Sequence, residues 1–164
     1  MITAAQFVDQ AENGGYLGIP YKDLDCQAFV EKVLSDAGEA GHNWRGSNHM
    51  WRDALSEKHT EMNKAEVPAG AWLFTLRYDG GEKERGYTDG EGNAKHVGIY
   101  LGNGKVIHST SAGSCGVQMD RITSARWNAW GLCKYIQYQS DRPNINDAIS
   151  ALNVIYRFIT GGAS

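Results

Sequence analysis

The apolar residues of the first part of the chain recur at helical spacing. In residues 3–15, "TAAQFVDQAENGG", they fall on one helical face. These residues are Ala4, Phe7, Val8 and Ala11. Thr3 and Gln6 have the spacing of a capping box, and Gly14 with Gly15 is typical of a helix end. The pattern predicts a first helix that packs one face against a core.

A second helix is predicted to begin at Cys26, with Asp25 as its N-cap. Its apolar stripe consists of Phe29, Val30, Val33, Leu34 and Ala37. Gly38 follows the stripe and is typical of the residue after a helix. Further along, Ser47 has the position of a cap for a short helix. The apolar residues of that short helix are Met50, Trp51, Ala54 and Leu55.

From residue 67 onward the pattern changes to that of strands. Residues 72–76 follow a Pro/Gly turn signal, and "HVGIYLGNGKVIHSTS" reads as a hairpin around Asn103-Gly104. Residues 116–120 and 130–139 are further strands, and the glycine-rich residues 79–95 form a long surface insert. Helices followed by antiparallel strands predict an α+β fold.

The last residues form a separate unit in this interpretation. Apolar residues recur at helical spacing in 141–164, at Ile145, Ala148, Ile149, Leu152, Ile155, Tyr156 and Ile159. We therefore divide the chain into a domain of residues 1–140 and an amphipathic helix in residues 141–164. That helix packs on the domain, connects it to something else or mediates assembly. The domain itself is expected to be a monomer.

Composition narrows the classes of function. The chain has 164 residues, enough for one domain, and a net charge of -3. This charge offers no broad basic surface, which argues against nucleic acid as a partner. No apolar run is long enough to span a membrane. The sequence shows no spacing of metal ligands, so no metal or cofactor is predicted.

The three cysteines do not describe a disulfide scaffold. Cys115 and Cys133 can pair or can each be a small buried hydrophobe, and we favour burial for both. Cys26 differs because it opens a helix, where backbone N–H groups stabilise a thiolate. From its position alone, Cys26 is at least as well interpreted as a simple buried residue as it is as a nucleophile. If Cys26 is a nucleophile, it should react with thiol reagents near neutral pH faster than the other two.

The hairpin carries two histidines that can supply a base. A two-residue turn at Asn103-Gly104 would place Ile99 opposite His108 and put His96 on the other face. A three-residue loop, Gly102 to Gly104, makes His96 the diagonal neighbour of His108, roughly 7–8 Å away at the backbone. That register also gathers the apolar residues Val97, Ile99, Leu101 and Ile107 on one face. We therefore predict a bulged three-residue loop, with Gly98 leaving space beside the imidazoles.

Three segments resemble the NlpC/P60 cysteine peptidases in order and spacing. They are "LDCQAFV", "VPAGAWLF" and "KHVGIYLGNGKVIHST", and the resemblance spans roughly residues 18–138. The family's third catalytic residue lies twelve positions after its histidine, as His108 lies after His96. The resemblance implies a papain-like α+β fold, with N-terminal helices packed on a central antiparallel sheet and the nucleophile at a helix N-terminus.

The resemblance also implies roles for individual residues. Cys26 would be the nucleophile, His96 the general base and then acid, and His108 the residue that orients His96. The bound partner would be a peptidoglycan stem peptide, cut between γ-D-glutamate and the diamino acid. The family's Ser-Gly after the cysteine is replaced here by Gln27 and Ala28, so preference for a free stem amine is not implied.

Substrate contacts are predicted for Tyr21, Asp25 and Gln27, which surround the nucleophile in the sequence. The family has a tyrosine ahead of its cysteine, and Tyr21 in "GIPY" is favoured over Tyr16 for that place. Among the tryptophans we choose Trp44 and Trp51, because they follow the nucleophile helix.

Three functions remain open at this point. The first is a stem-peptide endopeptidase, which includes a phage lysin or tail-associated lysin. The others are an N-acetylmuramoyl-L-alanine amidase of the kind seen in CHAP domains, and a catalytically silent wall-binding or virion module. Residues 1–15 lack the basic and apolar segments of a signal peptide. We therefore expect synthesis in the cytoplasm and delivery to the wall through a holin, a virion or a dedicated export system.

Overall fold

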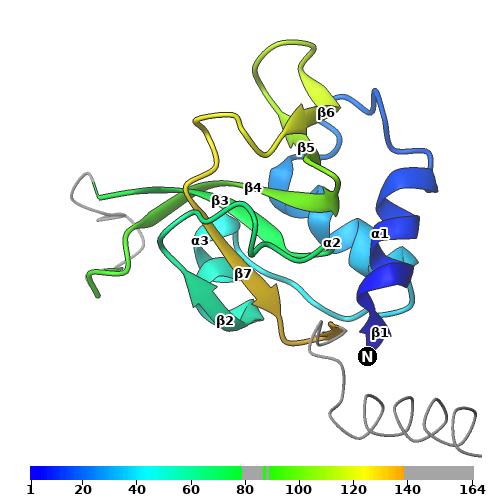
Figure 1. Cartoon of the computed structure of the whole chain (residues 1–164). Helices are drawn as coiled ribbons and strands as arrows, with labels where there is room; N and C mark the ends of the chain where they lie inside the picture. Colours follow the sequence, from blue (N-terminus) through cyan, green and yellow to red (C-terminus); the bar gives the residue numbers. More distant parts are fainter. Residues whose placement is uncertain (79–86, 88, 139–164) are drawn as a thin grey trace, which may run out of the picture.

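Both N-terminal helices begin at the caps that the sequence predicts. The computed structural model describes residues 1–78, 87 and 89–138 (Figure 1). Helix α1 (Ala4–Asn13) follows a complete capping box, in which the Thr3 hydroxyl accepts from the Gln6 N–H at 3.2 Å and the Gln6 side chain accepts from the Thr3 N–H at 2.9 Å. Helix α2 (Cys26–Asp36) has Asp25 as N-cap, whose carboxylate accepts from the Ala28 N–H at 2.8 Å.

The short third helix differs from its prediction. Helix α3 (Ser47–His49) continues into a π-helical turn, η1 (Met50–Ala54), and Leu55 then opens strand β2 (Leu55–His59). Ser47 does not cap the helix, because its hydroxyl donates instead to the Ala94 carbonyl at 2.5 Å. Strand β2 was missed by the sequence pattern, since three of its five residues are exposed and only its first is buried.

The strands form one six-stranded antiparallel sheet in the order β2-β7-β3-β4-β5-β6. Strands β3 (Trp72–Arg77), β4 (Asn93–Gly102) and β5 (Lys105–Thr110) occupy its middle, with β6 (Gly116–Arg121) at one edge and β7 (Ala129–Cys133) beside β2 at the other end. A small parallel pair joins β1 (Ile2–Thr3) to β8 (Ile136–Gln137), so the start of the chain lies beside residue 136.

The central hairpin has the predicted register but reaches it differently. Ile99 lies opposite Ile107 and Tyr100 opposite Val106, as the three-residue loop required. The predicted three-residue loop is wrong, because Gly102 pairs with Lys105 and only Asn103 and Gly104 form the turn. The extra residue sits in a β-bulge between Tyr100 and Gly102. A bulge shifts the register by one residue just as a longer loop would.

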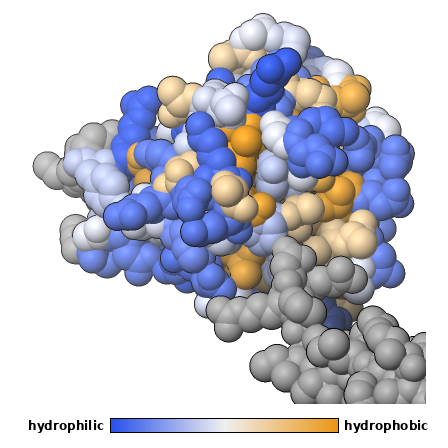
Figure 2. Space-filling model, in the orientation of Figure 1, coloured by the Kyte–Doolittle hydropathy of each residue, from blue (hydrophilic) through white to orange (hydrophobic). Residues whose placement is uncertain are grey.

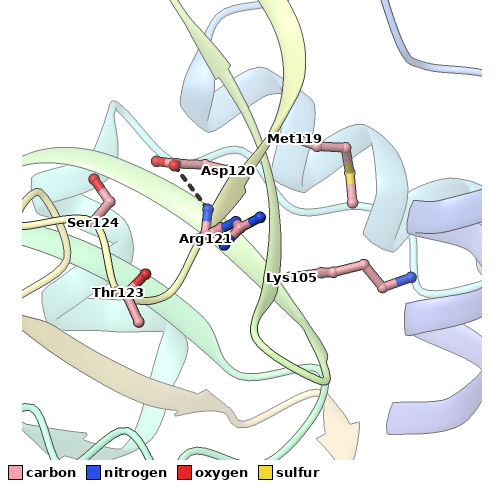
Figure 3. Close-up of a pocket in the computed structure, with 6 residues that line it drawn as sticks. All are labelled: Lys105, Met119, Asp120, Arg121, Thr123 and Ser124. Atoms are coloured by element: carbon pink, nitrogen blue, oxygen red, sulfur yellow. Dashed lines mark hydrogen bonds between the residues drawn. The ribbon is translucent and has the colours of Figure 1, made fainter.

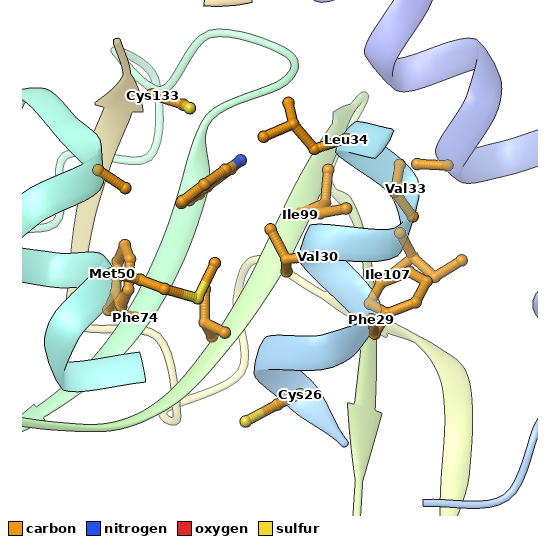
Figure 4. Packing of buried hydrophobic residues seen from close by; sticks show 14 of the residues in the cluster. Cys26, Phe29, Val30, Val33, Leu34, Met50, Phe74, Ile99, Ile107 and Cys133 are labelled. Carbon is orange, nitrogen blue, oxygen red and sulfur yellow. The ribbon is translucent and has the colours of Figure 1, made fainter. Parts of the chain in front are cut away.

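The sheet separates two apolar clusters. Helices α1 and α2 cover one face, where Val97, Ile99, Leu101 and Ile107 join the larger cluster, as predicted (Figures 1 and 4). The opposite face carries a smaller cluster. Its buried members include Leu73, Tyr100, Val106, Trp127 and Trp130. The outer surface in the view of Figure 2 is mainly hydrophilic, with scattered apolar residues.

The α+β class predicted from the sequence is confirmed, with N-terminal helices packed on an antiparallel sheet and Cys26 at the start of a helix. The helix predicted for residues 141–164 lies outside the described residues, as do residues 79–86 and 88 of the predicted insert. The insert ends earlier than predicted, because residues 93–95 already belong to β4. Among the helices that the structure does describe, none has both the length and the apolar character needed to cross a bilayer.

Candidate active site

Cys26 occupies the first turn of α2, at the edge of the larger apolar cluster (Figure 4). The segment before it is tied to the sheet. The Ser109 hydroxyl, fully buried in β5, donates to the Leu24 carbonyl, and the Tyr21 N–H donates to the Cys115 carbonyl at 3.2 Å. These bonds join the nucleophile's loop to strand β5 and to the residue that precedes β6. Ser109 also follows His108 directly, so the same strand fixes both the loop and a histidine.

The Cys26 thiol has a raised pKa, contrary to what its helix position alone implied. Burial, with a side chain 7% exposed, raises the pKa because a thiolate is poorly solvated there. Hydrogen bonding from the backbone of Val97, Gln27 and Cys26 itself acts in the opposite direction. The resting cysteine is therefore a neutral thiol held against the backbone of Val97, the residue next to His96.

The two hairpin histidines contact each other. His96 Nε2 lies 2.7 Å from His108 Nδ1, and the ring planes are nearly perpendicular at 86°. Gly98 makes this arrangement possible. A Cβ atom at this position would lie 2.8 Å from the Trp127 ring and 3.0 Å from the Cβ of His108. The sequence predicted both the pairing and the space at Gly98.

A polar network fixes the strand just before His96. The Asn48 side-chain oxygen accepts from the Ala94 N–H at 2.7 Å and from Arg52 at 3.0 Å. Arg52 also holds Asp89 through two bonds of 2.7 Å and donates to the Gly92 carbonyl at 2.9 Å. Helix α3 and the π-helical turn therefore position the beginning of β4, two residues before the imidazole.

Both histidines are neutral at physiological pH. Burial is the main cause and lowers the pKa of His96 to about 3 and that of His108 to about 4. For His96 the neighbouring His108 and then the Arg126 charge act in the same direction. For His108 Arg126 again lowers the pKa, while Asp120 acts to raise it. An uncharged His96 can accept a proton, which is what a general base requires.

Arg126 determines which ring nitrogens carry protons. Its Nη1 lies 3.3 Å from His108 Nδ1 and 3.3 Å from the Thr110 hydroxyl. A guanidinium only donates, so His108 Nδ1 must be an acceptor and its proton lies on Nε2. The Asp120 carboxylate lies 3.9 Å from that Nε2, beyond hydrogen-bond distance, and its negative charge favours a proton there. Among the described residues, the buried Nε2 has no hydrogen-bond partner. His96 Nε2 must then donate to His108 Nδ1, which leaves the lone pair of His96 on Nδ1.

Trp127 and Arg126 are the site residues that the sequence did not indicate. The Trp127 ring stacks on His96 with 5.5 Å between ring centroids and meets His108 edge-on at 5.3 Å. Both residues lie between β6 and β7, where no periodic pattern or motif marks them. The Thr75 hydroxyl, which donates to the Arg126 carbonyl at 2.8 Å, holds this segment against β3.

The two candidate tyrosines have different surroundings. Tyr21 lies near the Cys26 side chain, and its pKa is raised by burial and then by the neighbouring Cys26 and Asp25. Tyr16 is buried, donates to Asp36 at 2.6 Å and packs edge-on against Phe29. Tyr21 thus lies at the nucleophile, as favoured from the sequence, whereas Tyr16 supports the packing of α2.

The flanking residues predicted to contact substrate lie beside Cys26. Asp25 is exposed, although its carboxylate already caps α2. The side chain of the half-buried Gln27 lies near Glu31, one turn along the helix. Both side chains are accessible beside the nucleophile.

The choice of Trp44 and Trp51 does not fit the structure. Trp51 is 1% exposed and packs edge-on against Phe74, and Trp44 is 4% exposed and packs against Trp72. The Trp44 indole donates to Asp53 at 3.1 Å. Residues after the nucleophile helix turn back under the sheet, so these rings stabilise the core and leave almost no surface for a substrate.

The cysteines differ in ways that the sequence did not predict. Cys115 is exposed, with a positive φ of 52°, so its predicted burial is wrong. Cys133 is fully buried, its pKa is raised by burial to about 12, and both are free thiols. The exposed position of Cys115 removes the reason to expect Cys26 to be alkylated first.

We now expect iodoacetamide at pH 7 to modify Cys115 first, then Cys26, and Cys133 last. Alkylation of Cys26 should accelerate as pH rises, because its raised pKa leaves little thiolate at neutrality. Peptide mass spectrometry of time-quenched samples measures all three rates in one reaction. If Cys26 reacted faster than Cys115 at pH 7, the resting site would hold a thiolate–imidazolium pair instead of a neutral one.

The described residues contain no group of three or more His, Cys, Asp or Glu side chains arranged to hold a metal ion. The groups that the described site offers are a thiol, two imidazoles, a guanidinium and backbone N–H groups. A buried thiol at a helix N-terminus beside an oriented pair of imidazoles is an arrangement suited to nucleophilic attack on a carbonyl.

Comparison with known proteins agrees with this class of site. Residues 14–136 match the NlpC/P60 family. The fold is similar to the NlpC/P60 domain of the peptidoglycan hydrolase SagA, with a TM-score of 0.56, 19% identity, and coverage of 80% of this chain and 99% of that chain. It also resembles the peptidoglycan hydrolase RipB from Mycobacterium tuberculosis, with a TM-score of 0.52, 19% identity, and coverage of 79% and 65%.

An NlpC/P60 family protein from Bacillus cereus ATCC 10987 gives a TM-score of 0.54 at 22% identity, covering 77% of this chain and 40% of that one. A search of curated protein sequences found no match. The family match spans most of the chain, and the chain belongs to the NlpC/P60 family.

Proposed function

We propose that this protein is a cysteine peptidase that hydrolyses amide bonds in peptidoglycan stem peptides. The observation that carries the proposal is the His96–His108 pair, joined at 2.7 Å on the hairpin whose Val97 backbone lies against Cys26. The tautomer inferred above leaves the lone pair of His96 on Nδ1. The similarity to domains of peptidoglycan hydrolases supports the choice of substrate.

The proposed mechanism uses only groups of this chain. Cys26 Sγ attacks the amide carbonyl while its proton passes to His96 Nδ1, and the imidazolium then gives that proton to the leaving amine. The backbone N–H groups at the start of α2 stabilise negative charge at the reacting carbon's oxygen. Water, deprotonated by His96, then cleaves the thioester and restores the thiol. His108 retains the proton on Nε2 throughout and keeps His96 in the reactive tautomer.

The bond proposed from the family resemblance lies between γ-D-glutamate and the diamino acid. We propose that Tyr21 and Asp25, which lie near Cys26, contact the glutamyl side of the substrate. The alternatives are cleavage at N-acetylmuramoyl-L-alanine and a catalytically silent module. The formation of the His96–His108 contact, with Gly98 making space for it, favours a catalytic site over a silent module.

Mass spectrometry of fragments released from purified peptidoglycan distinguishes these functions. Stem peptides cut after γ-D-glutamate, released by the wild-type protein and not by Cys26→Ala, are the expected products. Whole stems that begin with L-alanine would identify an amidase. Absence of release from several wall types would contradict the proposal. Delivery to the wall by a phage or a dedicated export system stays a prediction.

Arg126 provides a test of the proposed proton arrangement. We expect Arg126→Gln to move the acidic limb of the pH profile of kcat/KM to higher pH. Burial still lowers the pKa of His96 and His108, but the variant removes a positive charge that lowers both further. Activity requires neutral His96 and is lost as pH falls through its pKa, so a higher pKa shifts the limb upward.

Arg126→Lys is the matched control for this experiment, because it keeps the charge and loses the planar guanidinium. Its acidic limb should lie closer to that of the wild type. A limb unchanged in Arg126→Gln would show that Arg126 does not influence the base. A uniform fall in activity without a shift would indicate a merely structural role.

A further inference from the structure

One nitrogen of the histidine pair lacks a hydrogen bond. His108 is fully buried, and its Nε2 has no partner within the part of the chain that the structure describes. The tautomer inferred above puts a proton on this nitrogen. A buried N–H donor is unfavourable without an acceptor, so an acceptor is expected beside it. Gln118 lies directly opposite His108 on β6, but its side-chain oxygen already accepts from the Ser114 hydroxyl.

Asp120 is the acceptor that faces this nitrogen. It lies opposite Val106, two residues before His108 on β5, so strand alternation places it on the face of the sheet that carries His108. Its two oxygens have different surroundings. Oδ1 accepts from the Arg121 N–H at 2.7 Å, whereas Oδ2 lies 3.9 Å from His108 Nε2. One oxygen is therefore anchored to the backbone, and the other faces the ring.

The outer side of Asp120 reaches solvent. Its side chain is 26% exposed and borders a hollow of about 690 Å³ that Lys105 and Arg121 also line (Figure 3). The Asp120 carboxylate points to one side of β6 and Met119 to the other in Figure 3. The carboxylate thus lies between solvent and the buried His108. A shift of about 1 Å brings Oδ2 within hydrogen-bond distance of Nε2.

The charges around the histidine pair give this contact a function. The charged and titratable groups that act on His108 are His96 on β4, Arg126 before β7 and Asp120 on β6. When His96 takes the thiol proton, positive charge appears in a buried pair that already faces the Arg126 guanidinium. The Asp120 carboxylate offsets this charge. A hydrogen bond to Nε2 also makes His108 Nδ1 a stronger acceptor for His96.

We infer that Asp120 is a positioning residue, whose Oδ2 accepts a hydrogen bond from His108 Nε2 while His96 carries the thiol proton. The inference rests on the proposed function. Contacts of catalytic groups are often long in a site without substrate and shorten when the substrate is bound. Asp120 acts only through His108, which it holds in the Nε2–H tautomer, and it thereby makes His96 a stronger base.

Asp120→Asn removes the charge and keeps the size of the side chain. On a synthetic stem peptide with lysine or diaminopimelate, kcat should fall about tenfold with little change in KM, because one charge-assisted hydrogen bond is lost. The acidic limb of the pH profile should move to lower pH, since loss of the carboxylate lowers the pKa of His108 further. Arg126→Gln moves the limb in the opposite direction, so the double variant should return it toward that of the wild type.

Two variants serve as controls. Asp120→Glu keeps the charge and should retain most of the activity, with the limb near that of the wild type. Glu12→Gln removes a carboxylate that pairs at 2.6 Å with Lys105 of the same hollow, and it should change neither kcat nor the limb. Nitrogen NMR of histidine-labelled protein gives a check that needs no activity, because His108 should carry its proton on Nε2.

Three results would overturn the role of Asp120 and leave the peptidase function intact. They are a proton on His108 Nδ1 in the wild type, an unchanged kcat in Asp120→Asn, and a loss of activity in that variant without a shift of the limb. Failure of the wild type to cleave any stem peptide would overturn the proposed function, and the role of Asp120 with it.

Discussion

Cys26→Ala is expected to lower kcat/KM by at least about a thousandfold, because no other group at the site can form the thioester. The substitution removes one sulfur atom from the edge of the apolar cluster and keeps the Asp25 cap of α2. The fold should therefore survive. Release of soluble peptide from a synthetic stem substrate measures the activity, and thermal unfolding checks the fold.

Cys133→Ala is the matched control for this substitution. Cys133 is also buried and also has a raised pKa, but it lies in β7, away from the histidine pair. It should keep the wild-type kcat/KM while losing about 1 kcal/mol of stability from the deleted core atom. A Cys26→Ala variant with even a tenth of the wild-type rate would mean that Cys26 is not the nucleophile.

His96→Gln is expected to lower kcat/KM by about a thousandfold, within the range of general acid–base catalysis. Glutamine can still hydrogen bond to His108, but its amide cannot accept the thiol proton or return it to the leaving amine. The reaction of the remaining Cys26 would then depend on free thiolate. The residual activity should therefore rise with pH, because the pKa of Cys26 is raised by burial.

His59→Gln serves as the control, since His59 stacks on Trp130 with 3.8 Å between ring centroids and lies on the edge strand β2. Its kcat/KM and pH profile should match those of the wild type. If His96→Gln kept a high activity that did not depend on pH, His96 would not be the general base. The pH profile thus separates loss of a proton carrier from simple damage to the site.

The local elements were predictable because their causes are local. The capping box of Thr3 and Gln6 and the Asp25 cap connect residues three positions apart, so the sequence contains all the information needed. The hairpin register was predictable for a related reason. Only one register places the apolar residues of both strands on one face, and the structure reached it through a bulge at Leu101.

Elements whose partners are distant were not predictable. Strand β2 is mostly exposed and exists because it pairs with β7, more than seventy residues later. The same is true of β1, which pairs with β8 at the other end of the domain. The Ser47 hydroxyl was expected to accept from an N–H group of its own helix, and it donates instead to the distant Ala94 carbonyl.

The sequence by itself determined the helix that carries Cys26, the pairing of His96 with His108 and the space at Gly98, because spacing and side-chain size fix these features. Only the tertiary structure decided which further groups surround them. Folding brings Arg126 and Trp127 to the histidines, buries Trp44 and Trp51 in the core, and exposes Cys115. It also raised the pKa of Cys26, since the solvation lost on burial outweighs the helix N-terminus, and burial is set by the whole fold.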